Sequence, residues 1–442
     1  MDGLLTDLYQ LTMAAGYLQA GKASEVATFE LFVRRLPPNR NFILAAGLAQ
    51  AVEYLLNLRF EEDEISYLQS LPQFRDVSPR FYDVLRMFRF TGDVWAVPEG
   101  TPLFAGEPLM VVKAPLMEAQ IPETFLLATL GFQTLVATKA ARIREAAGPR
   151  EVVEFGTRRA HSPQAGMFAG RAAYIGGCVG TSNTLTGMRY DVPVFGTSAH
   201  SWVLSFASER EAFERLQKLL GPQTTYLIDS YDTLAGAREA VNIGKPFWGV
   251  RLDSGNLVAL SRAVRQILDE GGFPKARIMA TGDLNEYKIL ELVAAGAPID
   301  AFGVGTELAT SFDAPSHCAV YKMVELASDG SRRYTAKFSE EKHTLPGAKQ
   351  IFRSADHDLL GLISQPVPNG AKPLLKRVIR SGDLVEELPT ARKAREYALA
   401  SIDALPKNLR SLFECDPPWP VSYSAEIHRL LEDVRREMQD SR

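Results

Sequence analysis

The chain has little cysteine and no cysteine pattern. Its three cysteines, Cys178, Cys318 and Cys415, are scattered over 442 residues and form no CxxC pair. An odd number of widely spaced thiols excludes a disulfide framework and a zinc site of the usual spacing. We therefore expect reduced, mostly buried thiols, as in a cytoplasmic protein.

Long apolar runs, basic tails and internal repeats are also missing. Because no run of about 18 apolar residues occurs, no segment is expected to span a membrane. The opening MDGLLTDLYQ has no basic region before an apolar stretch, so no signal peptide is expected. A net charge of -4 without runs of like charge gives no footprint for nucleic acid or an anionic membrane. Small molecules are the expected partners.

The length predicts more than one domain. A chain of 442 residues exceeds the size at which a single hydrophobic core stops growing. A content of 46% hydrophobic and 23% charged residues is ordinary for a soluble enzyme. Strand-rich segments lie on both sides of a βα core. We predict the core over 119–328, and an α+β domain formed jointly by 1–118 and 329–442.

The predicted core consists of short apolar runs that each end in a polar, glycine-rich cluster and are separated by helical stretches. The six runs are 151–155, 192–195, 225–229, 247–253, 277–283 and 300–305. From Asp229 to Asp253, Asp283 and Gly305 the run ends are 24, 30 and 22 residues apart, which is the spacing of βα units. This predicts an α/β fold with a parallel sheet, closed as an irregular TIM-like barrel, although a complete barrel has eight units.

The polar clusters should meet, because ligands bind at the carboxyl ends of parallel strands. Arg158 and Arg159 follow the first run, where an arginine can clamp a carboxylate or phosphate through two hydrogen bonds. An ordinary surface salt bridge is the alternative. Asp229, Asp253 and Asp283 end three runs and can hold ribose hydroxyls or Mg²⁺-bound pyrophosphate. Each could equally cap the following helix.

Two further clusters suggest phosphate chemistry. Gly303 and Gly305, followed by Thr306, can present backbone N–H groups to a phosphate, or can simply let the chain turn. His200, one of six histidines, follows a Gly-Thr-Ser turn. An imidazole held on one side can attack phosphorus with its other nitrogen, whereas a lone histidine is more often a structural hydrogen-bonder. The residues alone leave both alternatives open.

Motifs in order along nearly the whole chain resemble the nicotinate phosphoribosyltransferase family. They are LLTDLYQLTMAAGY, EFGTRRA, GTSN, GTSAHSW, IDSYDT, GVRLDSGN, FGVGTEL and KFSEEKHTLPGAKQIFR. The resemblance implies that nicotinate and phosphoribosyl pyrophosphate give nicotinate mononucleotide and pyrophosphate, with ATP, as its Mg²⁺ complex, hydrolysed through a phosphohistidine. It also implies an irregular α/β barrel, a domain made from both termini, and a head-to-tail homodimer with shared active sites.

The resemblance also suggests roles for individual residues. It makes His200 the phosphate acceptor and Arg251 a catalytic anion-binding arginine. Phe155 would stack on the pyridine ring, and Tyr9 of a neighbouring subunit would cover the opposite face. The other expected substrate-binding residues are Arg158, Ser182, Thr197, Asp229, Asp253, Asp283, Gly303, Gly305 and Thr306. No residue is assigned as a metal ligand.

Ser182 is the position expected to select the base. Similar nicotinamide-using enzymes carry an aspartate there, which accepts from the amide and would repel the carboxylate of nicotinate. Ser182 therefore favours nicotinate. Asn256 departs from the family, since many nicotinate enzymes have aspartate there and the nicotinamide enzymes share the asparagine. We leave Asn256 out of the expected site.

Other functions fit the residues less well. A nicotinamide-using phosphoribosyltransferase is the nearest alternative, and a non-catalytic sugar-phosphate-binding barrel is a second. A quinolinate enzyme should need more clustered arginine and lysine, and it has no use for a phosphohistidine. A Schiff-base aldolase needs a lysine at a strand end, where this chain has arginine and aspartate. No chemistry is predicted for residues after about 390.

Overall fold

The computed structural model describes residues 3–316, 318–328, 330–338 and 344–440, so residues 339–343 of the motif KFSEEKHTLPGAKQIFR lie outside the described residues. The chain divides into two compact units. Unit 1 comprises Met1–Thr134, Ser316–Pro389 and Phe413–Arg442, and unit 2 comprises Leu135–Pro315 and Thr390–Leu412.

These limits differ from the predicted ones for three physical reasons. Helix α6 (Glu123–Ala147) is continuous across the boundary between the units, so the chain has no break near residue 118. Strand β12 (Ala319–Ser328) pairs with β1 (Val26–Val33), which places it in unit 1 and not in the core. Helix α15 (Ala391–Asp403), expected in the C-terminal part, packs against α7 (Pro163–Ile175) of unit 2.

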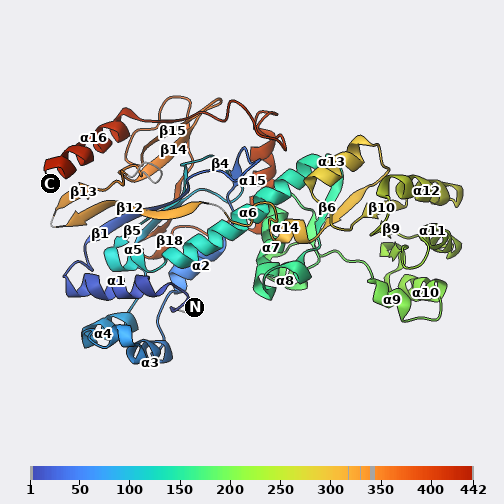
Figure 1. Cartoon of the computed structure of the whole chain (residues 1–442), viewed down its shortest axis with the longest axis horizontal. Coiled ribbons are helices and arrows are strands. Elements are labelled where there is room, and N and C mark those ends of the chain that lie inside the picture. The colour runs from blue at the N-terminus through green and yellow to red at the C-terminus, as the bar shows by residue number, and fades with distance from the viewer. Residues whose placement is uncertain (1–2, 317, 329, 339–343, 441–442) are drawn as a thin grey trace. The chain divides into compact units, whose positions relative to one another are not determined.

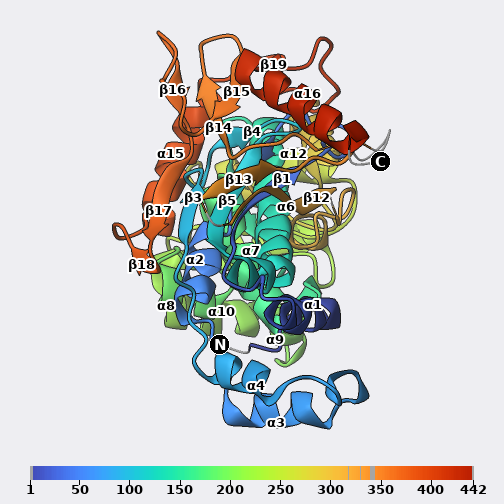
Figure 2. The same ribbon diagram turned by 90° about the vertical axis from the view of Figure 1, so that its left-hand side faces the viewer.

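Unit 1 is built on an antiparallel sheet. Among the described residues it has seven strands in the order β13 (Ser331–Tyr334), β12, β1, β5 (Pro108–Pro115), β3 (Asp93–Ala96), β17 (Lys376–Arg380) and β18 (Asp383–Leu384). Figure 2 shows β1, β5 and β3 side by side. The sequence VATFELFV of β1 is apolar apart from Thr28 and Glu30, and seven of its eight residues are buried, so this strand forms the centre of the unit.

Smaller elements complete unit 1. A second sheet contains β16 (Lys372–Pro373), β14 (Lys349–Arg353), β15 (Asp358–Leu362) and β19 (Val421–Tyr423). The strands β2 (Ile43–Leu44) and β4 (Pro102–Leu103) form a pair. The helices are α1 (Leu8–Gln19), α2 (Leu48–Asn57), α3 (Glu62–Ser70), α4 (Pro79–Arg86), α5 (Leu116–Gln120) and α16 (Ala425–Asp440).

Unit 2 is built on a parallel sheet, which confirms the α/β class. Its order is β7 (Gly180–Thr181), β6 (Glu151–Glu154), β11 (Ala301–Val304), β10 (Arg277–Ala280), β9 (Gly249–Leu252) and β8 (Thr225–Leu227). The first strand along this part of the chain, β6, pairs with the last, β11, as in barrel folds. No ladder joins β8 to β7 in residues 135–315, so barrel closure is not confirmed.

Five of the six predicted strands are present, and one differs. The run 192–195 makes only an isolated bridge, between Val194 and Thr181. The strand beside β6 is instead the two-residue β7, at the start of the GTSN motif. Proline at 193 cannot donate to a ladder, which restricts pairing along the predicted run.

Helices separate these strands along the chain. They are α7, α8 (Thr184–Tyr190), α9 (His200–Leu204), α10 (Glu209–Leu220), α11 (Thr233–Asn242), α12 (Leu257–Glu270), α13 (Glu286–Ala294), α14 (Thr306–Ala309) and the later α15. Helices α11 and α12 pack beside β9 and β10 (Figure 1). Each helix after β8, β9 and β10 begins at a polar side chain that accepts from its first turn: Asp232, Asn256 and Asn285.

The stretch Leu116–Ala147 is long and apolar enough to cross a membrane by length and composition. However, 67% of its apolar window is buried inside the protein. A buried core helix of a soluble protein has the same properties, so this stretch is weak evidence for a membrane span.

Candidate active site

A pocket lies where the carboxyl ends of β6, β7 and β9 meet the loop before α9, and its volume is about 290 Å³. Its lining residues come from unit 2 and are Phe155, Thr157, Arg158, Ser182, Gly196, Thr197, Ser198, Ala199, His200, Arg251 and Asp253. Seven of the predicted site residues are therefore brought together. The polar clusters meet because parallel strands end at the same edge of a sheet.

His200 is held by Asp229. Its Nε2 lies 3.1 Å from Asp229 Oδ1, and the Asp229 side chain is 2% exposed, while that of His200 is 42% exposed. The second carboxylate oxygen, Asp229 Oδ2, accepts from the backbone N of Asp253 at 3.0 Å and from Ser254 Oγ at 2.8 Å. Asp229 is thus a fixed anchor that orients a partly exposed imidazole.

Arg251 is the centre of a second network. Its Nε donates to Thr281 Oγ1 at 2.8 Å, its Nη1 to Thr197 Oγ1 at 2.8 Å, and its Nη2 to Asp253 Oδ1 at 2.6 Å. Burial raises the pKa of Asp253, but hydrogen bonds from Thr281 and Arg251 and the Arg251 charge outweigh it and hold this pKa below its usual value. The pocket therefore contains a fixed cation beside an ionised carboxylate.

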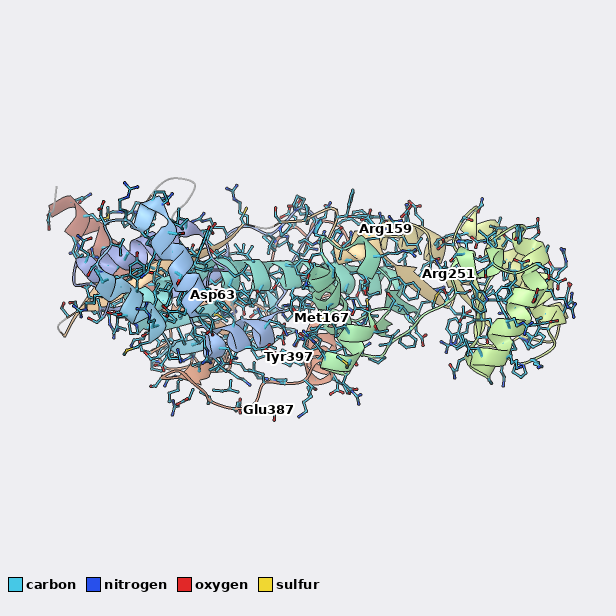
Figure 3. All side chains as sticks on the ribbon, turned by 90° about the horizontal axis from the view of Figure 1, so that it is seen from below. Asp63, Arg159, Met167, Arg251, Glu387 and Tyr397 are labelled. Carbon is cyan, nitrogen blue, oxygen red and sulfur yellow. The ribbon has the colours of Figure 1, made fainter. Side chains whose placement is uncertain are left out.

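Arg158 and Arg159 remain available to a ligand. They lie in the short 3-10 turn Thr157–Arg159 directly after β6, and both are exposed. Neither has an ion pair within the part of the chain that the structure describes, so the surface salt bridge considered above is not formed. Figure 3 shows Arg159 and Arg251 on unit 2. Arg158 lines the pocket and presents an uncompensated positive charge to it.

The three strand-end aspartates are not helix caps, because Asp232, Asn256 and Asn285 take that role three, three and two residues further along. Asp229 and Asp253 belong to the networks described above. Asp283 differs: it is exposed, has a left-handed φ of 46°, and does not line the pocket. Asn256 accepts from Ala259 N at 3.1 Å, so its side chain is used as a cap.

The predicted phosphate loop does not form in the expected way. Gly303 lies within β11, fully paired with β6, and not in a loop. A Cβ at Gly303 would lie 2.5 Å from Cδ2 of Phe155, so this glycine provides space for the aromatic ring. Gly305 precedes the four-residue α14 and accepts from Leu308 N and Ala309 N. Neither Gly305 nor Thr306 lines the pocket.

Tyr9 lies on α1 of unit 1 with a 48% exposed side chain.

Sequence reasoning missed several residues. Glu154 is fully buried directly before Phe155, and burial raises the pKa of its carboxyl, although hydrogen bonds from Thr181 and Gly156 oppose the shift. Thr281 and Ser254 hold Arg251 and Asp229, as described above. Thr157 Oγ1 and Ser198 Oγ are buried hydroxyls without a hydrogen-bond partner among the described residues, and both residues line the pocket. Glu154 carries no sequence signal, because a single glutamate at the end of a strand is usually exposed.

In residues 3–316, 318–328, 330–338 and 344–440, no group of three or more histidine, cysteine, aspartate or glutamate side chains could hold a metal ion. The pocket instead offers arginine cations and unpartnered hydroxyls, which are ligands for anions. Fold and site together define an α/β protein with an arginine-lined pocket at the carboxyl end of a parallel sheet.

Comparisons with known proteins give the family. Residues 4–131 match the model of the nicotinate phosphoribosyltransferase N-terminal domain, and residues 150–333 match the model of the nicotinate phosphoribosyltransferase family. Nicotinate phosphoribosyltransferase pncB2 of Mycobacterium tuberculosis is 45% identical over 98% of this chain and 94% of its own. That of Bacillus subtilis is 44% identical over 79% of this chain and 72% of its own. The chain belongs to the nicotinate phosphoribosyltransferase family.

Two solved structures have a fold similar to that of this chain. The crystal structure of human nicotinic acid phosphoribosyltransferase superimposes with a TM-score of 0.85 at 30% identity, covering 98% of this chain and 100% of that one. A nicotinate-nucleotide pyrophosphorylase from Pyrococcus furiosus gives 0.74 at 26% identity, covering 91% and 95%. The fold is therefore similar to these two structures over at least 91% of this chain.

Proposed function

We propose that this protein transfers the phosphoribosyl group of phosphoribosyl pyrophosphate to nicotinate. The ring nitrogen of nicotinate forms a bond to C1′ of the ribose, and the C1′–oxygen bond to pyrophosphate breaks with its electron pair leaving on pyrophosphate. The products are nicotinate mononucleotide and pyrophosphate. Family membership supports this reaction, and the pocket supplies a suitable environment.

The observation that carries the proposal is the composition of the pocket. Phe155 offers a flat face for a pyridine ring, and Arg158 offers an anionic group a cation that has no ion pair among the described residues. The transferred ribosyl carbon becomes cation-like, so positioning and stabilisation of the leaving pyrophosphate should supply most of the rate. Arg251 is held by three partners and can meet that charge without rearrangement.

ATP hydrolysis through His200 is the second part of the proposal. Because Nε2 is bound to Asp229, Nδ1 is the nitrogen left to attack the γ-phosphorus of ATP, with ADP as leaving group. Water then releases phosphate from the histidine. The unpartnered hydroxyls of Thr157 and Ser198 fit the oxygens of a bound phosphate. Mg²⁺ bound with the phosphates would neutralise their charge, and the ionised Asp253 would help to hold it.

Three further features belong to the proposal. We infer a homodimer in which Tyr9 of one subunit covers the site of the other, since Leu5, Leu8, Tyr9 and Met13 are exposed apolar side chains on or just before α1 of unit 1. A cytoplasmic location is consistent with three free cysteines. Barrel closure through the segment around Val194 is supported by the order of the six strands.

The test is product formation from phosphoribosyl pyrophosphate with nicotinate or with nicotinamide, with and without ATP. Nicotinate mononucleotide formed faster with ATP, together with ADP release, is the expected result. Equal or better use of nicotinamide would contradict the substrate assignment and leave the reaction class intact. No transfer to either base would favour a sugar-phosphate-binding protein without activity.

A further inference from the structure

The carboxyl group of Glu154 connects the two turns that carry the ring-binding side of the pocket. It is the last residue of β6 and is fully buried. One carboxylate oxygen accepts from the backbone N of Gly156, and the other accepts from Thr181 Oγ1 at 2.5 Å. The first contact lies within the turn of Phe155 and Arg158, and the second lies in the turn of Ser182.

The backbone of the same residue strengthens this connection. The carbonyl oxygen of Glu154 accepts from Ser182 N at 2.9 Å, and Thr181 Oγ1 accepts from Asn183 N at 3.0 Å. A Cβ at Gly156 would lie 2.3 Å from Ala309 Cβ, 2.7 Å from Gly305 O and 2.8 Å from Glu154 Oε1, so this turn requires glycine. Glu154 is therefore bonded to both sides of the ring-binding region, and the two partners of its carboxylate, Gly156 and Thr181, are themselves buried.

Stability alone does not account for a glutamate here. A carboxyl at the inner end of a parallel strand loses its hydration, and an apolar residue would avoid this penalty. Burial indeed raises the pKa of this group. The carboxyl binds two donors, and both belong to turns that line the pocket.

We propose that Glu154 is a positioning residue. It sets the separation between two turns, one that carries Phe155 and Arg158 and one that carries Ser182. This separation determines how a pyridine carboxylate fits between them. Glu154 does not line the pocket and acts through these neighbours. The inference rests on the proposed function, because it names the site in which nicotinate would bind. It predicts a loss in nicotinate affinity that leaves phosphoribosyl pyrophosphate binding nearly unchanged.

The experiment measures Glu154→Gln, Thr181→Val and the double variant that combines these two changes. Thr181→Ser, which keeps the hydroxyl, is measured for comparison. Each of the first two should raise KM for nicotinate, and its Kd by calorimetry, about tenfold, as expected when a hydrogen bond to a charged group is lost. KM for phosphoribosyl pyrophosphate should change less than about twofold, and the double variant should resemble the worse single one, because both remove the same contact. Thr181→Ser should retain the wild-type KM.

Glu30→Gln is the matched control, since Glu30 is equally buried and pairs with Lys349 at 2.7 Å in unit 1. It should lower the unfolding midpoint without changing either KM. Additive effects in the double variant, or equal changes in both KM values that follow the loss of folded protein, would overturn the inference. An inactive wild-type protein that binds no nicotinate would overturn the proposed function and this inference with it.

Discussion

His200 Nε2 lies 3.1 Å from Asp229 Oδ1, which joins a half-exposed imidazole to an almost fully buried carboxylate. Asp229 is fixed in turn by Asp253 N and Ser254 Oγ. The contact occupies Nε2 of the ring and leaves Nδ1 without a hydrogen bond among the described residues. In the proposed reaction, a histidine held in this way would present the same nitrogen to phosphorus in each cycle.

The first prediction concerns this pair. His200→Ala should abolish ATP turnover and phosphate labelling of the protein while leaving slow transfer from phosphoribosyl pyrophosphate. Asp229→Asn should lower ATP turnover about tenfold to a hundredfold, since it weakens a hydrogen bond to a charged group. ADP release and radiolabelled phosphate on the protein are the measurements. Ser254→Ala, which removes one bond to Asp229 but no charge, should have a smaller effect. Full labelling of His200→Ala would refute the assignment.

Gly303 gives the second prediction. Because a Cβ there would lie 2.5 Å from Phe155 Cδ2 and 2.6 Å from Thr281 Cγ2, Gly303→Ala should displace the aromatic ring. KM for nicotinate should rise about tenfold with a modest loss of stability, typical of an overpacked site. Gly16→Ala is the control, since a Cβ at Gly16 meets nothing within 4 Å. The measurement is KM for nicotinate from steady-state kinetics of both variants. An unchanged KM in Gly303→Ala would show that the position of the Phe155 ring does not control nicotinate binding.

The fold was predictable where apolar runs end in polar clusters. Strands β6, β8, β9, β10 and β11 follow that pattern, and the match is close because buried parallel strands are continuous apolar segments. Strand β7 has two residues and no apolar run, so no periodicity could reveal it. Domain limits were harder, because α15 returns to unit 2 through tertiary packing that the local sequence does not encode.

Which residues form the site could be predicted from residue type and position, but the role of each residue could be predicted less well. His200, Arg158 and Arg251 meet in one pocket, as expected for residues at strand ends. The packing role of Gly303 was not predicted, because glycine serves both phosphate loops and close packing, and only the position of Phe155 reveals the second. Glu154 was missed because its function depends on Thr181, a partner 27 residues away. Three-dimensional contacts of this kind are not visible in one sequence.

A buried ion network in unit 2 gives the third prediction. Lys139 Nζ lies 2.6 Å from Glu286 Oε2 and 2.8 Å from Asp313 Oδ1, and its side chain is 1% exposed. Lys139→Met should cost about 2–3 kcal/mol, because it removes one of the two cations bonded to the fully buried Glu286 and leaves Arg142 as the other. Lys22→Met removes the exposed pair with Glu25 and should cost less than about 1 kcal/mol. Denaturant unfolding measures both, and equal effects would contradict the buried-charge argument.

A pair of buried carboxyl groups in unit 1 predicts a pH dependence. Burial, and then the nearby Asp358, raise the pKa of Glu107 well above its usual value, although Arg353 opposes the shift. A raised folded-state pKa means that the protonated form stabilises the fold. This contribution is complete below the unfolded-state pKa and is lost as pH rises through the folded-state value.

The contribution of Glu107 to the unfolding free energy should therefore fall as pH rises from about 4.3, the ordinary glutamate pKa, through the raised pKa of the folded state. Glu107→Gln, which is neutral throughout, should show a flatter profile, whereas replacing the exposed Glu53 by Gln should not. Urea unfolding across this range is the measurement. A Glu107→Gln profile parallel to the wild type would show that this carboxyl does not control the pH dependence.

The choice of base gives the last prediction. Ser182 lines the pocket without a charge, and its backbone N is fixed by the carbonyl of Glu154. Ser182→Asp would place a carboxylate beside the carboxylate of nicotinate, in surroundings where like charges repel strongly. We expect kcat/KM for nicotinate to fall about a hundredfold, equivalent to about 2.7 kcal/mol, while nicotinamide, which is neutral and can donate to aspartate, is affected less or gains. Ser182→Asn has a similar shape without the charge, so it separates repulsion from steric effects. If Asn and Asp reduce nicotinate use equally, size and not charge selects the base, and the electrostatic account of Ser182 is wrong.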